Sequence, residues 1–241
     1  MIPAFNEASR LPETLATLQD HFQGMTTQFI VVDDGSTDDT YKVATNFAAS
    51  GFPISVVRLD RNRGKGAAVR TGIALTTGHQ VLIMDADLAT DLDALKFMMQ
   101  RIEEVDIVIG SRSVPGSMVK SSSWTRSVMG RSFNRLVRLV LRLQIHDSQC
   151  GFKLFRGDVA RRLFAMSQVD GFAFDAELLL IAKILGCSVA EVPVTWTAVK
   201  GSSVRPVRDS FKSAGAIIVI WFRLRPAKVR RRAQALGWPP V

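Results

Sequence analysis

Short apolar runs rich in β-branched residues alternate along this chain with segments that have a helical spacing of apolar positions. The runs that predict strands are FIVVD (29–33), ISVVRL (54–59), QVLIMD (80–85), DIVIG (106–110) and SVAEVPV (188–194). Helical patterns lie between them, at 11–22, after the GSTDDT turn, at 66–77 and at 92–104. The alternation predicts an α/β fold with a Rossmann-like, mostly parallel sheet flanked by helices.

Two later segments combine apolar stripes with many basic residues. The first, 124–143, carries Arg126, Arg131, Arg135, Arg138 and Arg142, and the second joins IIVIWF to RLRPAKVRRR. Each pattern is typical of a helix on a membrane surface, and the alternatives are a packed helix or a basic tail with a solvated charged face. No run of about 18 apolar residues predicts a helix that spans a membrane. We therefore expect one domain at 1–212 and a basic amphipathic, membrane-proximal tail at 213–241.

Composition narrows the class of protein and of partner. The chain has 241 residues, of which 47% are hydrophobic, and a net charge of +9. This is a globular composition, and its basic excess favours a polyanionic partner, with a solvated basic surface as the alternative. The two cysteines, Cys150 and Cys187, and the absence of a CxxC motif argue against a disulfide framework or a zinc site. The start shows no secretory signal, and MIPAFNE resembles the end of a strand, as if residues were missing before Met1.

Charged residues follow three of the predicted strands, where open parallel sheets bind their ligands. Asp33 and Asp34 end the 29–33 run, Asp85 and Asp87 follow the 80–85 run, and Arg112 follows the 106–110 run. Alternation along an extended segment places Asp85 and Asp87 on the same side. Their hard oxygen atoms suit Mg²⁺ or Mn²⁺ carrying a diphosphate, and the alternative is a carboxylate cluster that caps the following helix.

The segment RNRGKGAAVRTG places Lys65 between two glycines at the start of a predicted helix. A helix N-terminus with a basic residue suits an anion, although the spacing is not that of a P-loop. Asp33 or Asp34 could hydrogen-bond a nucleobase or ribose, or they could cap a helix.

Eight motifs occur in an order that resembles the family 2 glycosyltransferases with a GT-A fold. They are IPAFNE, VVDDGSTDDT, RNRGKGAAVRTG, LIMDADLATD, GSR, DSQCGFKLFR, GFAFDAELL and VPVTW followed by GSSVRPVRDS. Within that family the chain is most similar to the dolichyl-phosphate (polyprenyl-phosphate) glucosyltransferases, with the dolichyl-phosphate mannose synthases as cousins. The resemblance covers residues 2 to 212.

The resemblance implies a role for each matching residue. Those expected to bind the donor nucleotide are Pro3, Ala4, Phe5, Glu7, Asp33, Asp34, Lys65, Asp85 and Arg205. Asp85 and Asp87 would hold the diphosphate through a Mg²⁺ or Mn²⁺ ion, and Asp87 also counts as catalytic. Arg112 and Arg126 would grip the acceptor phosphate. Arg112, Arg126 and Asp147 are counted as catalytic with Asp87. Asp147, Asp175 and Glu177 remain ambiguous: they could orient sugar hydroxyls, or act as a base if the acceptor is a sugar, and a helix cap is the alternative for the last two.

The implied reaction is an inverting transfer of a hexose, glucose from UDP-glucose, onto a dolichyl or polyprenyl phosphate at the cytoplasmic face of a membrane to which the protein is peripherally bound. A polyprenyl phosphate is already ionised, so the site needs arginines to hold it more than a base to activate it. Alternatives are GDP-mannose as donor, a glycan hydroxyl as acceptor, and a family member that binds without turnover. A nucleic-acid partner is disfavoured, because the aromatic residues are mostly Phe in apolar runs, with one tyrosine, Tyr41.

Overall fold

The protein has a central mixed sheet. The computed structural model describes residues 1–120, 124–199 and 206–238. It describes the side chains of these ranges except those of 124–129 and 206–214. One part of the sheet is parallel and has the order β1 (Ile2–Ala4), β2 (Phe29–Asp33), β3 (Ile54–Arg58). The other part has the order β4 (Gln80–Ile83), β7 (Lys153–Arg156), β5 (Ile107–Ser111), β8 (Val189–Pro193). In it, β7 runs antiparallel to both of its neighbours, and β5 and β8 are parallel.

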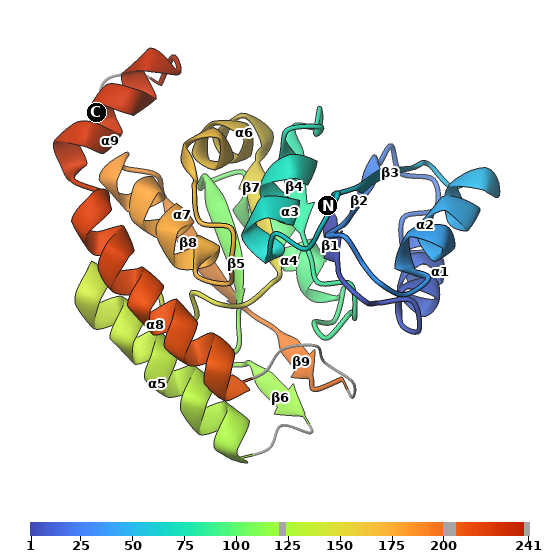
Figure 1. Ribbon diagram of the computed structural model, residues 1–241, viewed down its shortest axis with the longest axis horizontal. Helices are drawn as coiled ribbons and strands as arrows, with labels where there is room; N and C mark the ends of the chain where they lie inside the picture. Colours follow the sequence, from blue (N-terminus) through green and yellow to red (C-terminus); the bar gives the residue numbers. More distant parts are fainter. Residues whose placement is uncertain (121–123, 200–205, 239–241) are drawn as a thin grey trace.

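Two backbone hydrogen bonds join the two parts between β1 and β4. The Met1 nitrogen donates to the Leu82 carbonyl at 2.8 Å, and the Met84 N–H donates to the Met1 carbonyl at 3.2 Å. The strands thus follow the order β3-β2-β1-β4-β7-β5-β8, with β1 and β4 at the centre (Figure 1). A separate parallel pair, β6 (Met118–Lys120) and β9 (Thr195–Thr197), lies beyond the ends of β5 and β8.

Helices flank the sheet and bury the apolar faces that their sequences predict. Their bounds are α1 (Leu11–His21), α2 (Thr40–Ala49), α3 (Lys65–Ile73), α4 (Ala94–Arg101), α5 (Trp124–Leu141), α6 (Gly157–Met166), α7 (Phe174–Ile184), α8 (Pro206–Arg223) and α9 (Pro226–Ala235). In α1, Leu11, Leu15 and Leu18 are fully buried. The helices α5 and α8 pack side by side, and α9 continues from α8 at one end of the molecule (Figure 1).

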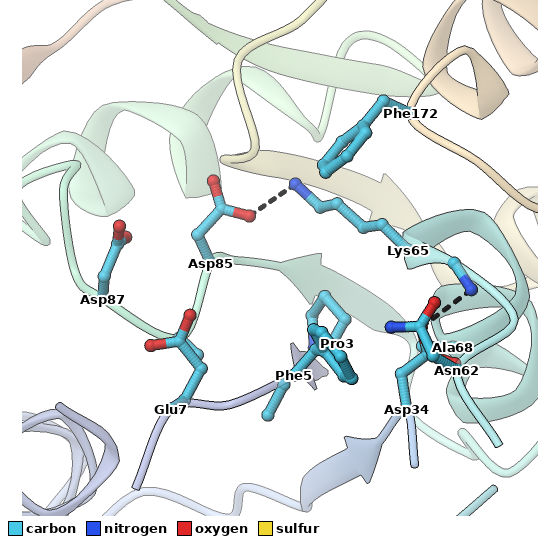
Figure 2. A pocket seen from close by; sticks show the side chains of 13 residues that line it. Pro3, Phe5, Glu7, Asp34, Asn62, Lys65, Ala68, Asp85, Asp87 and Phe172 are labelled. Carbon is cyan, nitrogen blue, oxygen red and sulfur yellow. Dashed lines mark hydrogen bonds and ion pairs between the residues drawn. The ribbon is translucent and has the colours of Figure 1, made fainter. Parts of the chain in front are cut away.

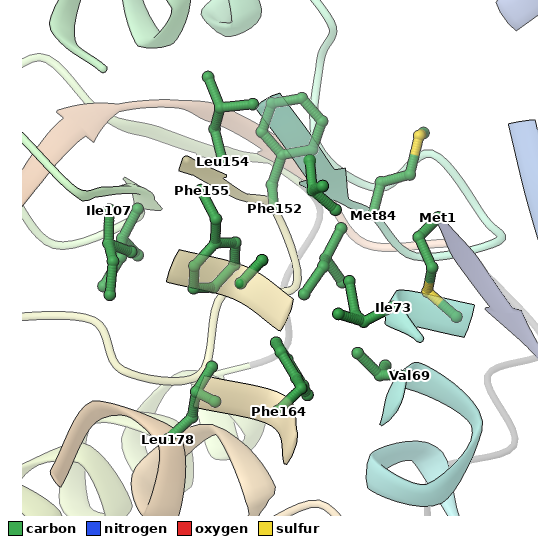
Figure 3. Close-up of a cluster of buried hydrophobic side chains, with 14 of the residues drawn as sticks. Met1, Val69, Ile73, Met84, Ile107, Phe152, Leu154, Phe155, Phe164 and Leu178 are labelled. Carbon is green, nitrogen blue, oxygen red and sulfur yellow. The ribbon is translucent and has the colours of Figure 1, made fainter. Parts of the chain in front are cut away.

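The core lies between the sheet and the helices α3, α6 and α7. Figure 3 shows Phe155 of β7 and Phe164 of α6 near Leu178 of α7, with Met1 and Val69 at the β1 side. The rings of Phe155 and Phe164 make an edge-to-face contact at 6.0 Å. Burial of each such side chain contributes about 1.5–3 kcal/mol, so this cluster ties the two parts of the sheet to the same helices.

All five predicted strands are confirmed: the bounds of 29–33 match those of β2, and the other predicted bounds differ from the observed ones by at most two residues. The end of β4 matters most, because it stops at Ile83, so that Asp85 and Asp87 lie in the following turn rather than on an extended strand. Sequence analysis missed β7, the short strands β6 and β9, and the helix α6. The domain boundary predicted after residue 212 falls inside α8. None of the helices in the described ranges is long and apolar enough to cross a membrane.

Candidate active site

A cavity of about 280 Å³ opens at the carboxyl ends of β1, β2 and β4, the position predicted for a ligand. Its lining residues are Pro3, Ala4, Phe5, Glu7, Asp34, Asn62, Gly64, Lys65, Ala68, Asp85, Ala86, Asp87 and Phe172. Figure 2 shows Glu7, Asp85 and Asp87 on one side of this cavity and Asp34 and Asn62 on the other. The cavity therefore brings together eight of the residues to which the resemblance assigns a donor or metal role.

The segment after β1 forms one wall and is fixed by the DDGSTDDT motif. The N–H of Asn6 donates to Ser36 Oγ at 2.9 Å, and the N–H of Glu7 donates to Thr40 Oγ1 at 2.7 Å. The Asn6 side chain in turn accepts a hydrogen bond from the N–H of Thr37 at 2.9 Å. Asn6 has a φ of 55°, a left-handed conformation that asparagine tolerates better than most residues. These bonds hold the backbone that presents Glu7 to the cavity.

Asp34 lines the cavity, and Asp33 does not. Each oxygen of Asp34 accepts one backbone hydrogen bond, from the N–H of Arg63 at 2.8 Å and from that of Gly64 at 2.7 Å. Burial raises the pKa of Asp34, and these two hydrogen bonds oppose the rise. A carboxylate oxygen has more than one acceptor site, so Asp34 keeps capacity for a ligand.

Asp33 points to the opposite side of the strand end, away from the cavity. It accepts a hydrogen bond from the N–H of Ser36 at 3.0 Å and forms an ion pair with Arg58 at 3.2 Å. Asp33 therefore does not line the cavity in this structure, and its contact with the nucleotide stays a prediction. The reason is that adjacent residues of a strand project to opposite faces, so Asp33 and Asp34 cannot both face one cavity.

The loop 61–64 passes directly over the turn after β2, and Gly35 makes this possible. Gly35 has a φ of 67°, and a β-carbon there would overlap the backbone of Arg61 and Asn62. Only glycine satisfies both the backbone conformation and the close approach. The contact sets the position of Asn62 and Gly64 in the cavity wall.

Lys65 pairs with the first of the two carboxylates after β4, that of Asp85. Its Nζ lies 2.5 Å from Asp85 Oδ1, and the Asp85 side chain remains 40% exposed toward the cavity (Figure 2). Burial opposes ionisation of Asp85, but Lys65 outweighs burial and holds the pKa of Asp85 below its usual range. Burial raises the pKa of Asp87, and the charge of Asp85 adds to the rise. The next residue, Leu88, has a φ of 47°, which marks a strained turn at this site.

Glu7 adds a third carboxylate to this side of the cavity. Arg10 holds it at two points, with Nε and Nη2 each 2.6 Å from a carboxylate oxygen. Burial nevertheless raises the pKa of Glu7 to about 6, and Asp87 and Asp85 contribute to the rise. The cavity thus concentrates negative charge around one lysine.

The donor set fits a hard divalent cation that brings its own ligands. Asp85 and Asp87 offer carboxylate oxygens, which Mg²⁺ and Mn²⁺ prefer. Burial first, and then the charge of Asp85, raise the pKa of Asp87, so a cation there would favour its ionised form. Within the described ranges no group of three His, Cys, Asp or Glu is placed to hold a metal alone. A cation at this place would need further oxygens, such as those of a diphosphate.

Behind Asp85 lies a buried ion pair that sequence analysis did not foresee. Lys153 of β7 is 1% exposed, and its Nζ donates to Asp175 Oδ1 at 2.6 Å and to the Cys150 carbonyl at 2.5 Å. Burial raises the pKa of Asp175, and Lys153 opposes the rise. A β-carbon on Gly151 would overlap the Asp85 carboxylate, so the DSQCGF turn lies directly against Asp85. Lys153 therefore fixes the backbone on which Asp85 rests.

Arg112 and Asp147, both predicted as catalytic, bind each other. The guanidinium contacts the carboxylate at two points, at 2.7 and 2.9 Å, and lies 5.5 Å from the ring centre of Trp196. Asp147 is fully buried and also accepts a hydrogen bond from Asn134 at 3.2 Å. Burial works against its ionisation, but Arg112 outweighs burial and lowers the pKa of Asp147 to about 2. A buried carboxylate so fully engaged does not accept a proton near neutral pH, so this geometry disfavours the role of a base, which the sequence left open for a sugar acceptor. Its observed contact positions Arg112.

Of the remaining predicted residues, Glu177 makes contacts within the fold, and Arg205 and the side chain of Arg126 are not described by the structure. Glu177 accepts hydrogen bonds from Ser167, Gln168 and Val169 and pairs with Arg223, so it is engaged in holding the fold. Arg205 lies outside the described residues, as does the side chain of Arg126, whose backbone belongs to α5.

Sequence analysis also missed Arg10, Asn62, Lys153 and Phe172. Arg10 follows Glu7 by three residues, a spacing that could have indicated their contact. Asn62 and Phe172 lie within the quoted motifs RNRGKGAAVRTG and GFAFDAELL, but no local pattern marks either of them as a cavity residue. Nothing local distinguishes Lys153 from a surface lysine.

Comparison with known proteins agrees with the motif order. The family model described as "Glycosyl transferase family 2" matches residues 1–164. The chain is 36% identical over 239 residues to the dolichyl-phosphate beta-glucosyltransferase of Dictyostelium discoideum, which covers 92% of this chain and 73% of the relative. It is 38% identical over 223 residues to the protein of the same name from Mus musculus, with 86% and 69% covered.

A solved structure with a similar fold is the glucosyl-3-phosphoglycerate synthase of Mycobacterium tuberculosis in complex with Mn²⁺ and UDP-glucose. The TM-score is 0.67, at 18% identity, with 93% of this chain and 78% of that chain covered. At this identity the likeness concerns the fold, and it agrees with the GT-A architecture expected from the motifs. The motif order, the strand-end cavity and the family match lead to one conclusion: the chain belongs to glycosyl transferase family 2.

Proposed function

We propose that this protein transfers glucose from UDP-glucose to the phosphate of a dolichyl or related polyprenyl phosphate. The observation that carries the proposal is the cavity with Asp85, Asp87 and Glu7 on one side and Asp34 on the other, in which Lys65 pairs with Asp85. The names of the relatives above, dolichyl-phosphate beta-glucosyltransferase, support this choice of donor sugar and acceptor.

The donor would lie along the cavity with its base near Asp34 and its diphosphate near Asp85. Asp34 is held by the backbone of residues 63 and 64, so its free acceptor positions have a fixed direction. The Lys65 ammonium is placed to bind a diphosphate oxygen, because it already binds an anionic oxygen of Asp85. A divalent cation on Asp85 and Asp87 would supply positive charge to the leaving diphosphate.

Arg112 would bind the acceptor phosphate. Two of its N–H groups are engaged by Asp147, and the planar guanidinium carries five, so others remain for phosphate oxygens. The side chain is 27% exposed, which keeps an approach open. Its fixed orientation lowers the entropic cost of binding an anion. We propose that Arg126 assists Arg112, and that Arg205 covers the donor diphosphate.

The reaction is a single displacement at the anomeric carbon. An oxygen of the acceptor phosphate forms a bond to C1 of glucose from the face opposite to the nucleotide. The bond between C1 and the diphosphate oxygen breaks, and UDP leaves with the electron pair. No proton moves in this step, so the engagement of Asp147 by Arg112 is compatible with the reaction.

The outer face of α5 and α8 would bring the enzyme to its lipid substrate. Large apolar side chains there are exposed, at 51% for Trp221, 54% for Ile218 and 60% for Phe222 in α8, and at 70% for Leu139 in α5. Arginines 135, 138 and 142 are exposed at the same end of α5. Apolar side chains beside arginines favour the interface of an anionic membrane. We propose peripheral attachment through this face, on the cytoplasmic side.

The test is transfer of radiolabel from UDP-glucose into a lipid extract. The purified protein is incubated with polyprenyl phosphate in vesicles and Mn²⁺ or Mg²⁺, with GDP-mannose as a parallel donor. We expect lipid-linked label from UDP-glucose, lost in Asp87→Asn and retained in Asp93→Asn, an exposed carboxylate near the same turn. Label from GDP-mannose alone would assign the protein to mannosyl transfer, and no lipid-linked label from either donor would overturn the lipid acceptor.

A further inference from the structure

Glu177 of α7 connects α8 to a loop that forms part of the cavity wall. It is fully buried, and the mechanism above does not use it. Its two oxygens face different elements: Oε2 faces residues 167–169, and Oε1 faces Arg223 near the end of α8. We propose that Arg223 and Glu177 are positioning residues for the donor cavity, through which α8 sets the place of the wall formed by residues 167–172.

The carboxylate of Glu177 determines the shape of the turn after α6. Oε2 accepts three hydrogen bonds, from Ser167 Oγ at 2.7 Å, from the N–H of Gln168 at 2.9 Å and from that of Val169 at 2.8 Å. Hydrogen bonds to a charged acceptor are stronger than those between neutral groups. The turn therefore moves with the carboxylate rather than independently of it.

The following residues reach the cavity. The Asp170 carbonyl accepts a hydrogen bond from the N–H of Ala67 at 3.2 Å, and the Asp170 carboxylate pairs with Arg63 at 3.7 Å and with Arg70. A β-carbon on Gly64 would overlap the Asp170 carbonyl, and one on Gly66 would overlap that of Val169. The loop is thus in direct contact with the segment that bears Lys65.

Phe172 completes this connection on the cavity side. Its ring stands over the cavity on the side of Lys65, opposite Pro3 and Phe5 (Figure 2). It is 38% exposed, as expected of a side chain whose missing contacts a ligand would provide. A shift of residues 167–169 would move Phe172 and the backbone next to Lys65 together.

Arg223 is the cation that pairs with the buried carboxylate of Glu177. Removing one partner of a buried pair leaves the other charge uncompensated, which drives rearrangement around it. The same helix carries Ile218, Val219, Trp221 and Phe222 on its exposed face. At the end of α8, Arg223 therefore contacts Glu177 on the donor side of the molecule, and the neighbouring apolar residues of the helix face outward.

This inference rests on the proposed use of the cavity for a uridine nucleotide. The experiment measures the dissociation constant of UDP with Mn²⁺ by titration calorimetry on the full chain, without lipid. We expect Arg223→Gln to bind UDP at least about threefold more weakly, with an unchanged number of sites. Arg223→Lys, which keeps the charge, should restore most of the affinity. Arg225→Gln, which removes an exposed arginine two positions further on, should bind as the unaltered protein does.

The number of sites separates positioning from stability, because a variant that merely unfolds in part loses sites and keeps its dissociation constant. An unchanged constant in Arg223→Gln, or an equal loss in Arg225→Gln, would overturn the inference. If the unaltered protein does not bind UDP, the proposed function fails instead.

A second measurement needs no substitution. We expect UDP with Mn²⁺ to slow hydrogen exchange at the amides of Gln168 and Val169, which Glu177 holds. Exchange at these amides that is indifferent to saturating UDP would overturn the inference even if Arg223→Gln does not fold.

Discussion

The guanidinium of Arg112 binds the carboxylate of Asp147 at two points, Nε to Oδ2 at 2.7 Å and Nη2 to Oδ1 at 2.9 Å. Asp147 thereby fixes the direction of the arginine that we propose for the acceptor phosphate. Substitution Asp147→Asn should raise the KM for polyprenyl phosphate about tenfold or more and leave the dissociation constant of UDP unchanged. It should also lower the free energy of unfolding by about 1.5–3 kcal/mol, the range for a lost charged hydrogen bond.

The two readouts distinguish this role from that of a base. Were Asp147 a base, kcat would fall by orders of magnitude and the lipid KM would stay the same. A fall in kcat alone would contradict the role that we assign to the ion pair.

Glu7 should make stability depend on pH in the weakly acidic range. Its pKa is raised from 4.5 to about 6 in the folded protein, so the folded state holds a proton there that the unfolded chain has already lost. Between pH 4.5 and 6 folding must take up this proton from solution, which becomes less favourable as the pH rises, and the free energy of unfolding should fall by about 2 kcal/mol over this range. In Glu7→Gln this contribution should be absent.

The measurement is urea unfolding of both proteins at pH 4 and pH 7, without metal. From pH 4 to pH 7, the free energy of unfolding of the unaltered protein should fall by about 2 kcal/mol relative to that of Glu7→Gln. A constant difference would show that Glu7 titrates normally.

Gly151 provides the space that Asp85 occupies. A methyl group there would overlap the Asp85 carboxylate and displace it from the cavity. We expect Gly151→Ala to weaken binding of UDP with Mn²⁺ by about tenfold, and to cost about 1–3 kcal/mol of stability as an overpacking substitution. Gly130→Ala is the control, because Gly130 lies in α5 with open space around it, and a helical alanine there should be neutral or slightly stabilising. Equal UDP affinity in both variants would contradict the contact.

Lys65 is the nearest positive charge to Asp85, so its removal should have opposite effects on metal and on donor. In Lys65→Met, the freed carboxylate should bind Mn²⁺ alone more tightly, as measured by the electron paramagnetic resonance signal of unbound Mn²⁺. The value of kcat/KM for UDP-glucose should fall by about tenfold to a hundredfold, because a charged hydrogen bond to the diphosphate is lost. Lys42→Met, at an exposed position of α2, should change neither. Weaker Mn²⁺ binding in Lys65→Met would show that the lysine does not compete with the cation.

The exposed residues of α8 should govern attachment to membranes. Phe222→Ser removes a 60% exposed aromatic side chain from the face of α5 and α8, and co-sedimentation with anionic vesicles should weaken by about tenfold. Phe97→Ser removes a side chain of α4 that is 59% exposed, and it should leave co-sedimentation unchanged. UDP binding in the absence of vesicles should be the same in both. An equal effect of the two substitutions would place the membrane-binding face elsewhere.

The sequence predicted the α/β class, the main strands and most of the cavity, because these features leave local signals. Apolar runs marked β2 through β5 and β8, and polar residues directly after them marked the ligand-binding edge. Alternation along β2 places Asp33 and Asp34 on opposite sides, so the sequence favours only one of them as a cavity residue. Strand β7 was missed since it has only four residues and begins with a lysine, and a buried lysine contradicts the pattern by which strands are found.

The ion pairs around the site could not be predicted from local pattern. Arg112 and Asp147 are 35 residues apart, and Lys153 and Asp175 are 22 apart. Which carboxylate meets which cation depends on how the strands are ordered in space, and that order follows from packing over the whole domain. The resemblance supplied motif positions, but the role of Asp147 stayed open in the sequence, because only the fold brings it to Arg112.

The antiparallel strand β7 has a consequence for how the chain acquires its fold. It fills the space between β4 and β5, so β4, which leads to the paired carboxylates, has one edge without a partner until residues 153–156 are available. About 70 residues separate these two strands along the chain, which corresponds to several seconds of synthesis at the usual rate of about 5–20 residues per second. During that interval the β4 edge is a template for pairing with other chains. Strand β7, whose Lys153 supports the backbone beside Asp85, therefore also covers the β4 edge and ends the interval in which that edge could pair with other chains.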